Sequence, residues 1–153
     1  MDDKDRRILE LLQANALATA AEIADQVGLT TTPCWRRIQR LEEQGYIRGR
    51  VALLDHQKMN VGTTVFVAVR TNRHSTEWLQ RFSETISRTP EILEVHRLSG
   101  DIDYLLRIVV PSIAEYDRVY QSLIRELEFL DVSSSFSMEE LKFTTAVPVS
   151  HAG

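Results

Sequence analysis

Apolar residues recur at helical spacing in three stretches near the start of the chain. Residues 5–13 predict a first amphipathic helix, because their isoleucine and leucines fall on one side. Thr19 and Glu22 have the spacing of a capping box, in which each side chain binds the other residue's backbone N–H, so a second, short helix is expected to begin there and to end at Gly28. Thr30 is expected to cap a third helix that runs to residue 44.

The second and third predicted helices are separated only by residues 28–30, which is typical of a helix-turn-helix. Cys34, Ile38 and Leu41 share one side of the third helix and are expected in the core. The opposite side is polar and basic, and in a helix-turn-helix this face enters the major groove of DNA. The predicted DNA contacts are therefore the residues of this face and two arginines beyond it, namely Thr30, Thr31, Thr32, Trp35, Arg36, Gln39, Arg40, Arg48 and Arg50.

These side chains differ in what they offer to DNA. Arginine pairs with the guanine edge and glutamine with the adenine edge, whereas Arg48 and Arg50 are placed to hold the flanking phosphates. Trp35 fits either a packed flank or a DNA contact. Arg37 lies beside the apolar stripe and is expected to form an intramolecular ion pair, and Cys34 is expected to be a small core residue without redox function.

The pattern changes to strands and helices after residue 60. Residues 46–54 are predicted as a short strand or an extended linker. Strands are then predicted at 63–69, 92–98, 104–110 and about 132–142, with helices at 77–88 and after a capping box at 112–115. The second helix is expected to bury Tyr116, Tyr120, Leu123 and Leu127. This βαββαβ order is that of a ferredoxin-like domain.

A polar loop at residues 99–103 joins two of these strands. Gly100 permits a close backbone approach, and nearby amides are able to receive a carboxylate. Asp101 or Asp103 offers a charge partner for an ammonium group, and Ser134 and Ser135 add hydroxyls if the last strand brings them near. The loop thus has the parts of an amino-acid site, and glycine with aspartate is equally the usual composition of a β-turn.

Charge is distributed unevenly. The net charge is −4, and all of it lies beyond residue 50, whereas residues 30–50 carry five arginines against two glutamates. That concentration indicates a polyanionic partner for one segment. No apolar run is long enough to span a membrane, the N-terminus is acidic and there is one cysteine, so a cytoplasmic protein is expected.

Two other classes of function fit the sequence less well. An enzyme is disfavoured because the histidines at 56, 74, 96 and 151 are scattered, with no metal-ligand cluster, phosphate loop or nucleophile elbow, so no catalytic residue, metal or cofactor is predicted. The second is a ligand-binding or oligomerisation module that regulates a protein partner instead of DNA. The basic outer face of the third helix argues against it.

Several motifs resemble one family of regulators. Residues 5–9 and 27–42 are similar to the helix-turn-helix of the Lrp/AsnC (feast/famine) family, and residues 99–104, 134–136 and 140–145 are similar to its effector domain. Residues 30–35 further resemble the cysteine-responsive DecR-like subgroup. The resemblance implies an α+β protein with a winged helix-turn-helix at 1–50, a strand hinge at 51–60, a ferredoxin-like ligand-sensing domain at 61–145 and a tail at 146–153.

The resemblance also implies partners. Members of the family regulate transcription by binding double-stranded DNA, pair through their sheets as homodimers and often assemble to octamers. Their amino-acid effector binds between subunits near the loop that joins the second and third strands of the sensing domain. Trp35 departs from the family, in which a smaller residue is usual. The implied effector contacts are Leu98, Gly100, Asp101, Asp103, Tyr104, Ser134 and Ser135.

Overall fold

The computed structural model describes residues 1–73 and 75–152; His74 and Gly153 lie outside the described residues. The chain forms two compact units, which are described separately. The first comprises Met1–Ala52 together with the C-terminal segment that begins at Leu141, and the second is Leu53–Glu140. Residues 141–145, which the sequence pattern assigns to the second domain, therefore group with the first.

Three helices build the first unit: α1 (Asp3–Ala14), α2 (Ala20–Val27) and α3 (Thr31–Glu43). The capping box of Thr19 and Glu22 forms as predicted, and α2 ends at Gly28 with a left-handed φ of 63°. Thr30 precedes α3 with extended backbone but makes no side-chain capping bond. The helices enclose a core of apolar side chains, namely Ile8, Leu9, Leu12, Ile23, Ala24, Cys34, Ile38 and Leu41.

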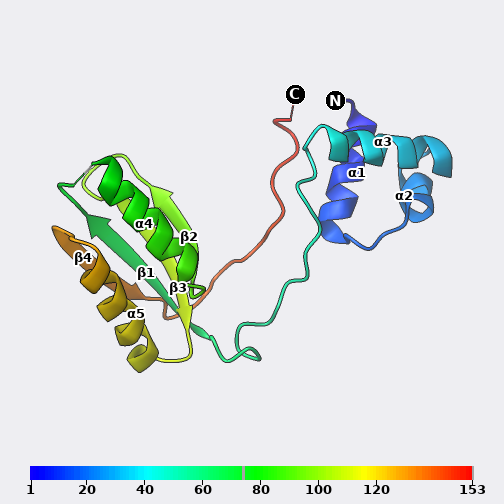
Figure 1. Cartoon of the computed structure of the whole chain (residues 1–153). Helices are drawn as coiled ribbons and strands as arrows, with labels where there is room; N and C mark the ends of the chain where they lie inside the picture. Colours follow the sequence, from blue (N-terminus) through cyan, green and yellow to red (C-terminus); the bar gives the residue numbers. More distant parts are fainter. Residues whose placement is uncertain (74, 153) are drawn as a thin grey trace. The chain divides into compact units, whose positions relative to one another are not determined.

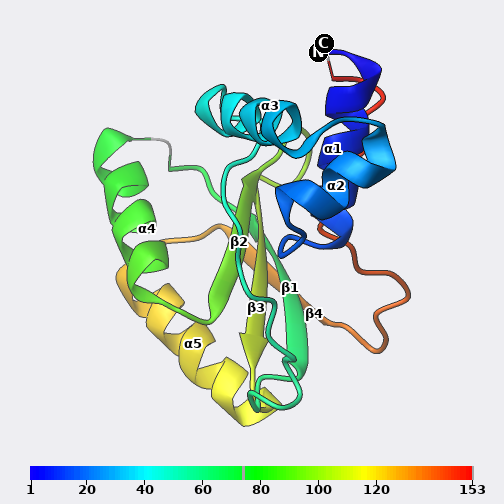
Figure 2. The same cartoon turned by 90° about the vertical axis from the view of Figure 1, so that its right-hand side faces the viewer.

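The second unit is a four-stranded antiparallel sheet covered on one face by two helices (Figures 1 and 2). Its elements are β1 (Thr63–Arg70), α4 (Thr76–Arg88), β2 (Ile92–Arg97), β3 (Tyr104–Val110), α5 (Ile113–Glu126) and β4 (Asp131–Phe136). The strand order is β2-β3-β1-β4. This is the βαββαβ arrangement expected from the sequence, so the α+β, ferredoxin-like prediction is confirmed.

The core of this unit lies between the sheet and the two helices. Alternate residues of β1 and β3 point into it, since successive side chains of a strand face opposite sides. Helix α5 buries Tyr116, Val119 and Leu123, with Leu127 at its C-cap, and Tyr120 is only partly buried. All four residues of the predicted stripe therefore face the core, with Tyr120 packed against its edge.

Two predicted strands differ from the structure. The last strand ends at Phe136 and not near residue 142, because its only partner is β1, which begins at Thr63. Beyond Ser137, whose N–H donates to the Thr64 carbonyl, β4 has no strand to pair with. Residues 46–54 contain no strand: residues 46 and 47 form a bend and residues 48–54 have no regular secondary structure, which agrees with the alternative prediction of a linker. Among the described residues, no helix is both long enough and apolar enough to cross a membrane.

Candidate DNA-binding surface and effector loop

Helix α3 is fixed in the first unit by one buried side. Cys34 is fully buried, and Ile38 and Leu41 are nearly so. Burial raises the pKa of the Cys34 thiol, because the apolar surroundings disfavour the thiolate. The prediction that Cys34 is a core residue is confirmed, and the opposite side of α3 must therefore face outward.

The outward side of α3 carries exposed hydroxyls and an arginine whose side chain has no partner among the described residues. Thr30, Thr31, Thr32 and Arg36 are exposed, and Trp35 keeps 52% of its surface accessible. Within the described part of the chain, the side chains of Arg36 and Arg48 make no hydrogen bond and no ion pair. The donors of these two guanidinium groups are therefore free to meet phosphate or base acceptors.

Three other residues predicted to contact DNA already have partners in the protein. Gln39 donates from Nε2 to Glu42 Oε2 at 3.0 Å, and Arg50 Nη2 lies 2.8 Å from Glu42 Oε1. Arg40 Nη2 lies 2.7 Å from a carboxylate oxygen of Asp5. The nitrogen that each of these side chains uses for its carboxylate partner is therefore available to DNA only if that contact is shared or broken.

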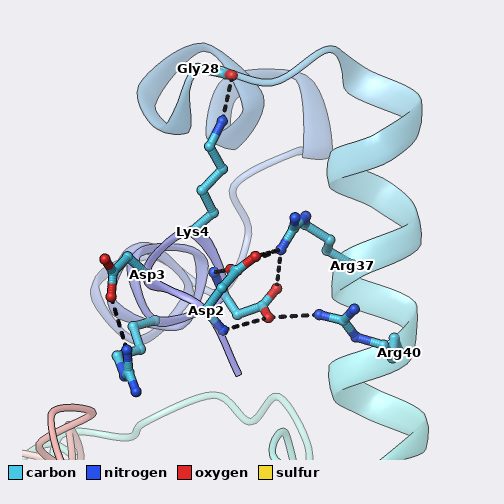
Figure 3. A network of polar contacts seen from close by, with 8 residues as sticks. Asp2, Asp3, Lys4, Gly28, Arg37 and Arg40 are labelled. Atoms are coloured by element: carbon cyan, nitrogen blue, oxygen red, sulfur yellow. Dashed lines mark hydrogen bonds and ion pairs between the residues drawn. The ribbon is translucent and has the colours of Figure 1, made fainter.

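Asp5 is the centre of a polar network that joins α1 to α3. Figure 3 shows Arg37 and Arg40 of α3 pointing toward the start of α1, where Asp2 lies. Its side chain is only 3% exposed, and its two oxygens accept from Arg37 at 2.8 Å and from Arg40 at 2.7 Å. Arg37 also donates to both oxygens of Asp2, which confirms the predicted intramolecular ion pair. The register of the DNA-facing helix relative to α1 is therefore set by two arginines on one buried carboxylate.

The same acids cap the start of α1, a feature that the sequence reading missed. Asp2 accepts from the Asp5 backbone N–H at 2.9 Å, and Asp5 accepts in return from the Asp2 backbone N–H. The backbone N–H of Asp5 and then the Arg37 side chain lower the pKa of Asp2 from 3.8 to about 2. The spacing of Asp2 and Asp5 is that of a capping box and was available as a signal.

The loop at residues 98–103 closes the end of the sheet. The backbone N–H of Leu98 donates to the Asp103 carbonyl at 2.9 Å, and the N–H of Asp103 donates to the Val69 carbonyl. Gly100 has a φ of 117°, a conformation that side chains with a Cβ rarely adopt. Asp103 accepts the Thr71 backbone N–H at 2.8 Å, so one of its oxygens is committed to holding the loop against the end of β1.

The remaining residues predicted to contact the effector do not gather around this loop. Tyr104 is buried in the core, with its ring 4.7 Å from that of Phe82. Ser134 is hydrogen-bonded to the Tyr116 hydroxyl beneath α5, and Ser135 lies on the other face of the sheet. Strand β1 separates β4 from β3, so a single chain brings together only Leu98, Gly100, Asp101 and Asp103 of the predicted set.

The face of the sheet away from the helices is partly apolar and carries one ionic cluster. Phe66 in β1 is 40% exposed, and its neighbours across the sheet are Arg107 and Ser135. Arg107 holds Glu94 at 2.6–2.8 Å and, as the largest cause, lowers the pKa of Glu94. His96 Nε2 lies 3.2 Å from Oε2 of the same carboxylate, so the ring of this strand residue has a partner.

Two families match the two halves of the chain. The winged helix-turn-helix DNA-binding family matches residues 1–48, and the Lrp/AsnC ligand binding domain matches residues 64–147. The chain belongs to the Lrp/AsnC family. The resemblance found in the sequence is therefore confirmed, and α3 lies within the part of the chain that matches a DNA-binding family.

Proteins similar over nearly the whole chain carry names of regulators. A glutamate uptake regulatory protein of Zymomonas mobilis subsp. mobilis is 50% identical over 149 residues, which are 97% of this chain and 91% of that protein. The DNA-binding transcriptional activator DecR of Escherichia coli K12 is 43% identical over 150 residues, 97% of this chain and 99% of that one. Membership of the Lrp/AsnC family and the helix-turn-helix match make the chain a DNA-binding transcriptional regulator.

Solved structures of similar proteins share the fold of the full chain. An AsnC family transcriptional regulator from Agrobacterium tumefaciens is 56% identical with a TM-score of 0.93 and covers 97% of both chains. A transcriptional regulator from Neisseria meningitidis, solved in complex with L-methionine, is 32% identical with a TM-score of 0.93 and covers 99% of this chain and 98% of that one.

Proposed function

We propose that this Lrp/AsnC regulator recognises a specific operator through the outer face of α3. The observation that carries the proposal is Arg36, which is exposed and unpaired within the described residues on the side opposite the buried stripe. We assign base contacts to Arg36 and to the hydroxyls of Thr31 and Thr32, since arginine pairs bidentately with guanine and threonine suits either base or phosphate. Trp35 flanks this face and shields it from one side.

The paired residues are assigned positioning and backbone contacts. Arg40 is anchored on Asp5 through Nη2, and its other N–H groups, which have no partner within residues 1–73 and 75–152, are assigned to a phosphate. Arg48, whose side chain has no partner among the described residues, is assigned to the flanking phosphates. Arg50 and Gln39 both bind Glu42, and each must break its contact with Glu42 before it reaches DNA. Thr30 is placed at the helix N-terminus, where backbone N–H groups favour a phosphate.

The effector is proposed to be an amino acid held at the 98–103 loop. The match to the Lrp/AsnC ligand binding domain and the L-methionine complex of the Neisseria meningitidis regulator support this class of ligand. Backbone amides around Gly100 would receive the α-carboxylate, and Asp101 is the better partner for the ammonium group because Asp103 is engaged by Thr71. Cysteine and leucine-type side chains both remain candidates.

The incomplete set of effector residues on one chain supports a homodimer. Leu98 and Phe66 are exposed apolar residues, and burying them against a second copy would remove them from water. The second copy would supply the serines of β4, or other side chains, to complete the site. Higher assembly to an octamer and a cytoplasmic location, where bacterial DNA lies, belong to the same proposal.

Binding to DNA tests the proposal directly. Full-length protein is titrated into fluorescent duplexes, one from the promoter region of its own gene and one of equal length and shuffled sequence, with and without each of the twenty amino acids. Preference for the promoter duplex that changes with one amino acid supports the proposal. Equal affinity for the two duplexes under every condition refutes it.

A further inference from the structure

The C-terminal segment that follows β4 contacts helix α1, more than 130 residues away in the sequence. Gln13 in the last turn of α1 forms two hydrogen bonds to the backbone of Val147, one through its side-chain amide nitrogen and one through its side-chain oxygen. The Gln13 Nε2 donates to the Val147 carbonyl at 3.1 Å, and the Val147 N–H donates to Gln13 Oε1 at 2.6 Å. Both hydrogen bonds involve backbone atoms of Val147, so the side chain of Val147 takes no part in them.

Two further contacts continue the docking toward the end of the chain. The side chain of Val149 is half-buried and packs against the core of the three-helix unit. Arg6 in the first turns of α1 donates from Nη2 to the Ala152 carbonyl at 3.1 Å. Residues 141–148 are otherwise exposed, so the described part of the segment is held by one apolar side chain and a few polar contacts.

Such a small contact area makes the docking reversible. Segments with few buried apolar contacts open locally at much lower free energy than the core. Arg6 adds to this, because its Nε is buried without a hydrogen-bond partner among the described residues. A buried N–H without a partner is unfavourable, and this one belongs to the side chain that binds the Ala152 carbonyl.

The segment also connects two functional parts of the chain. It begins just after β4, which belongs to the sensing unit, and it ends on α1, which belongs to the DNA-binding unit. Helix α1 in turn holds the DNA-facing helix through Asp5. Besides the linker before β1, the docked segment is therefore a second link between sensor and helix-turn-helix.

We propose that Arg6, Gln13 and the apolar edge around Val149 form a docking surface for the chain's own C-terminal segment, and that release of this segment changes how α3 is presented to DNA. The proposal rests on the proposed function, because it names how effector binding near the sheet reaches α3. Effector binding controls DNA affinity through this route only if the docked and released states differ in affinity for the effector.

A pair of valine variants separates docking from simple charge effects. Val149→Asp places a carboxylate in the half-buried contact and is expected to release the segment. Val147→Asp is the matched control, because this side chain is 67% exposed and the contact uses only backbone atoms. Hydrogen exchange of the full-length protein measures the result: residues 147–152 and the end of α1 exchange faster in V149D and as in wild type in V147D.

The functional readout is the change in promoter affinity caused by an amino acid, measured with the panel of twenty. V149D is expected to lower this change by about threefold or more, with V147D like wild type. Gln13→Ala, which removes two hydrogen bonds without adding charge, gives a second releasing variant if V149D unfolds the helices. An unchanged amino-acid response in a variant whose segment is released overturns the proposal.

Failure of the proposed function would give a different experimental result from failure of the docking proposal. If no amino acid alters the promoter affinity of wild type, amino-acid control is refuted while docking is still tested by exchange at α3. Faster exchange of α3 amides in V149D but not in V147D then supports the link, and identical α3 exchange contradicts it. Release of the wild-type segment on dilution would show docking onto a second copy and would also contradict the proposal.

Discussion

Arg40 of the DNA-facing helix is ion-paired with Asp5 of α1, with 2.7 Å between Nη2 and Oδ2, and Asp5 is almost completely buried. Arg37 occupies the other carboxylate oxygen at 2.8 Å. A buried carboxylate is costly unless it is paired, so α1 and α3 are tied together at this point. The same relationship holds the Arg40 side chain, 47% exposed, in a limited range of positions at the edge of the DNA-binding surface.

Replacing Asp5 is expected to loosen this tie. Asp5→Asn keeps the size of the side chain but leaves two arginines without their shared anion, and it should lower the stability of the three-helix unit by about 1–3 kcal/mol. Asp3→Asn is the control, because Asp3 is fully exposed and pairs only with Arg6. Urea unfolding followed by hydrogen exchange of α1–α3 measures both variants. Equal stability of the two would show that the buried pairing contributes little.

The lowered pKa of Asp2 predicts a pH dependence. Because the folded-state pKa is about 2 and the ordinary value is 3.8, charged Asp2 favours the folded state above about pH 4. That contribution is lost as the pH falls from about 4 to about 2. Asp2→Asn retains a capping side chain and should therefore be less stable than wild type at pH 6 but approach it near pH 2. Stability curves measured across this range test it, and a pH-independent difference would argue against the Arg37 contact.

Arg36 is expected to contribute to specific binding more than any arginine that is already paired. Arg36→Ala should weaken binding to the promoter duplex by about 1–3 kcal/mol if the side chain makes a bidentate base contact. Arg7→Ala serves as the control, since Arg7 is exposed on α1 and paired with Glu10. Fluorescence anisotropy at fixed salt provides the affinities. An equal loss of promoter affinity in the two variants would mean that Arg36 contributes only a nonspecific positive charge.

The two aspartates of the 98–103 loop are expected to behave differently. Asp103→Ala should weaken the effector response and also lower the melting temperature of the unliganded protein, because it removes the acceptor for the Thr71 N–H. Asp101→Ala should weaken the response and leave that temperature unchanged, since Asp101 is exposed. Thermal shift with the amino-acid panel measures both properties. An effector titration unaltered in both variants would remove this loop from the site.

What the sequence revealed was mainly local. The capping residues and Gly28 mark helix ends through contacts within one turn, and β3 was predicted with its observed limits. The end of β4 was not predicted correctly, because a strand ends where the strand that it pairs with ends. The Asp5 network joins residues at least 32 positions apart, which no local pattern reveals, although the ion pair of Arg37 was anticipated from its place beside the apolar stripe.

The predicted effector residues show that neighbours in a sequence motif do not always lie together in the fold. Tyr104 was included as a neighbour of the loop, but strand alternation puts it on the same side as Leu106 and Ile108, facing the core. That alternation was visible in the sequence. The position of Ser134 beneath Tyr116 was not, because it depends on the pairing of β4 with β1 across the sheet.

The most direct test of the account compares promoter and shuffled duplexes over a range of salt concentrations with wild type and R36A. The account predicts that wild type prefers the promoter duplex, that affinity for both falls steeply with salt, and that R36A loses most of the preference while keeping salt-dependent binding. Wild-type protein that does not distinguish the duplexes at any salt concentration, with or without amino acids, would contradict it.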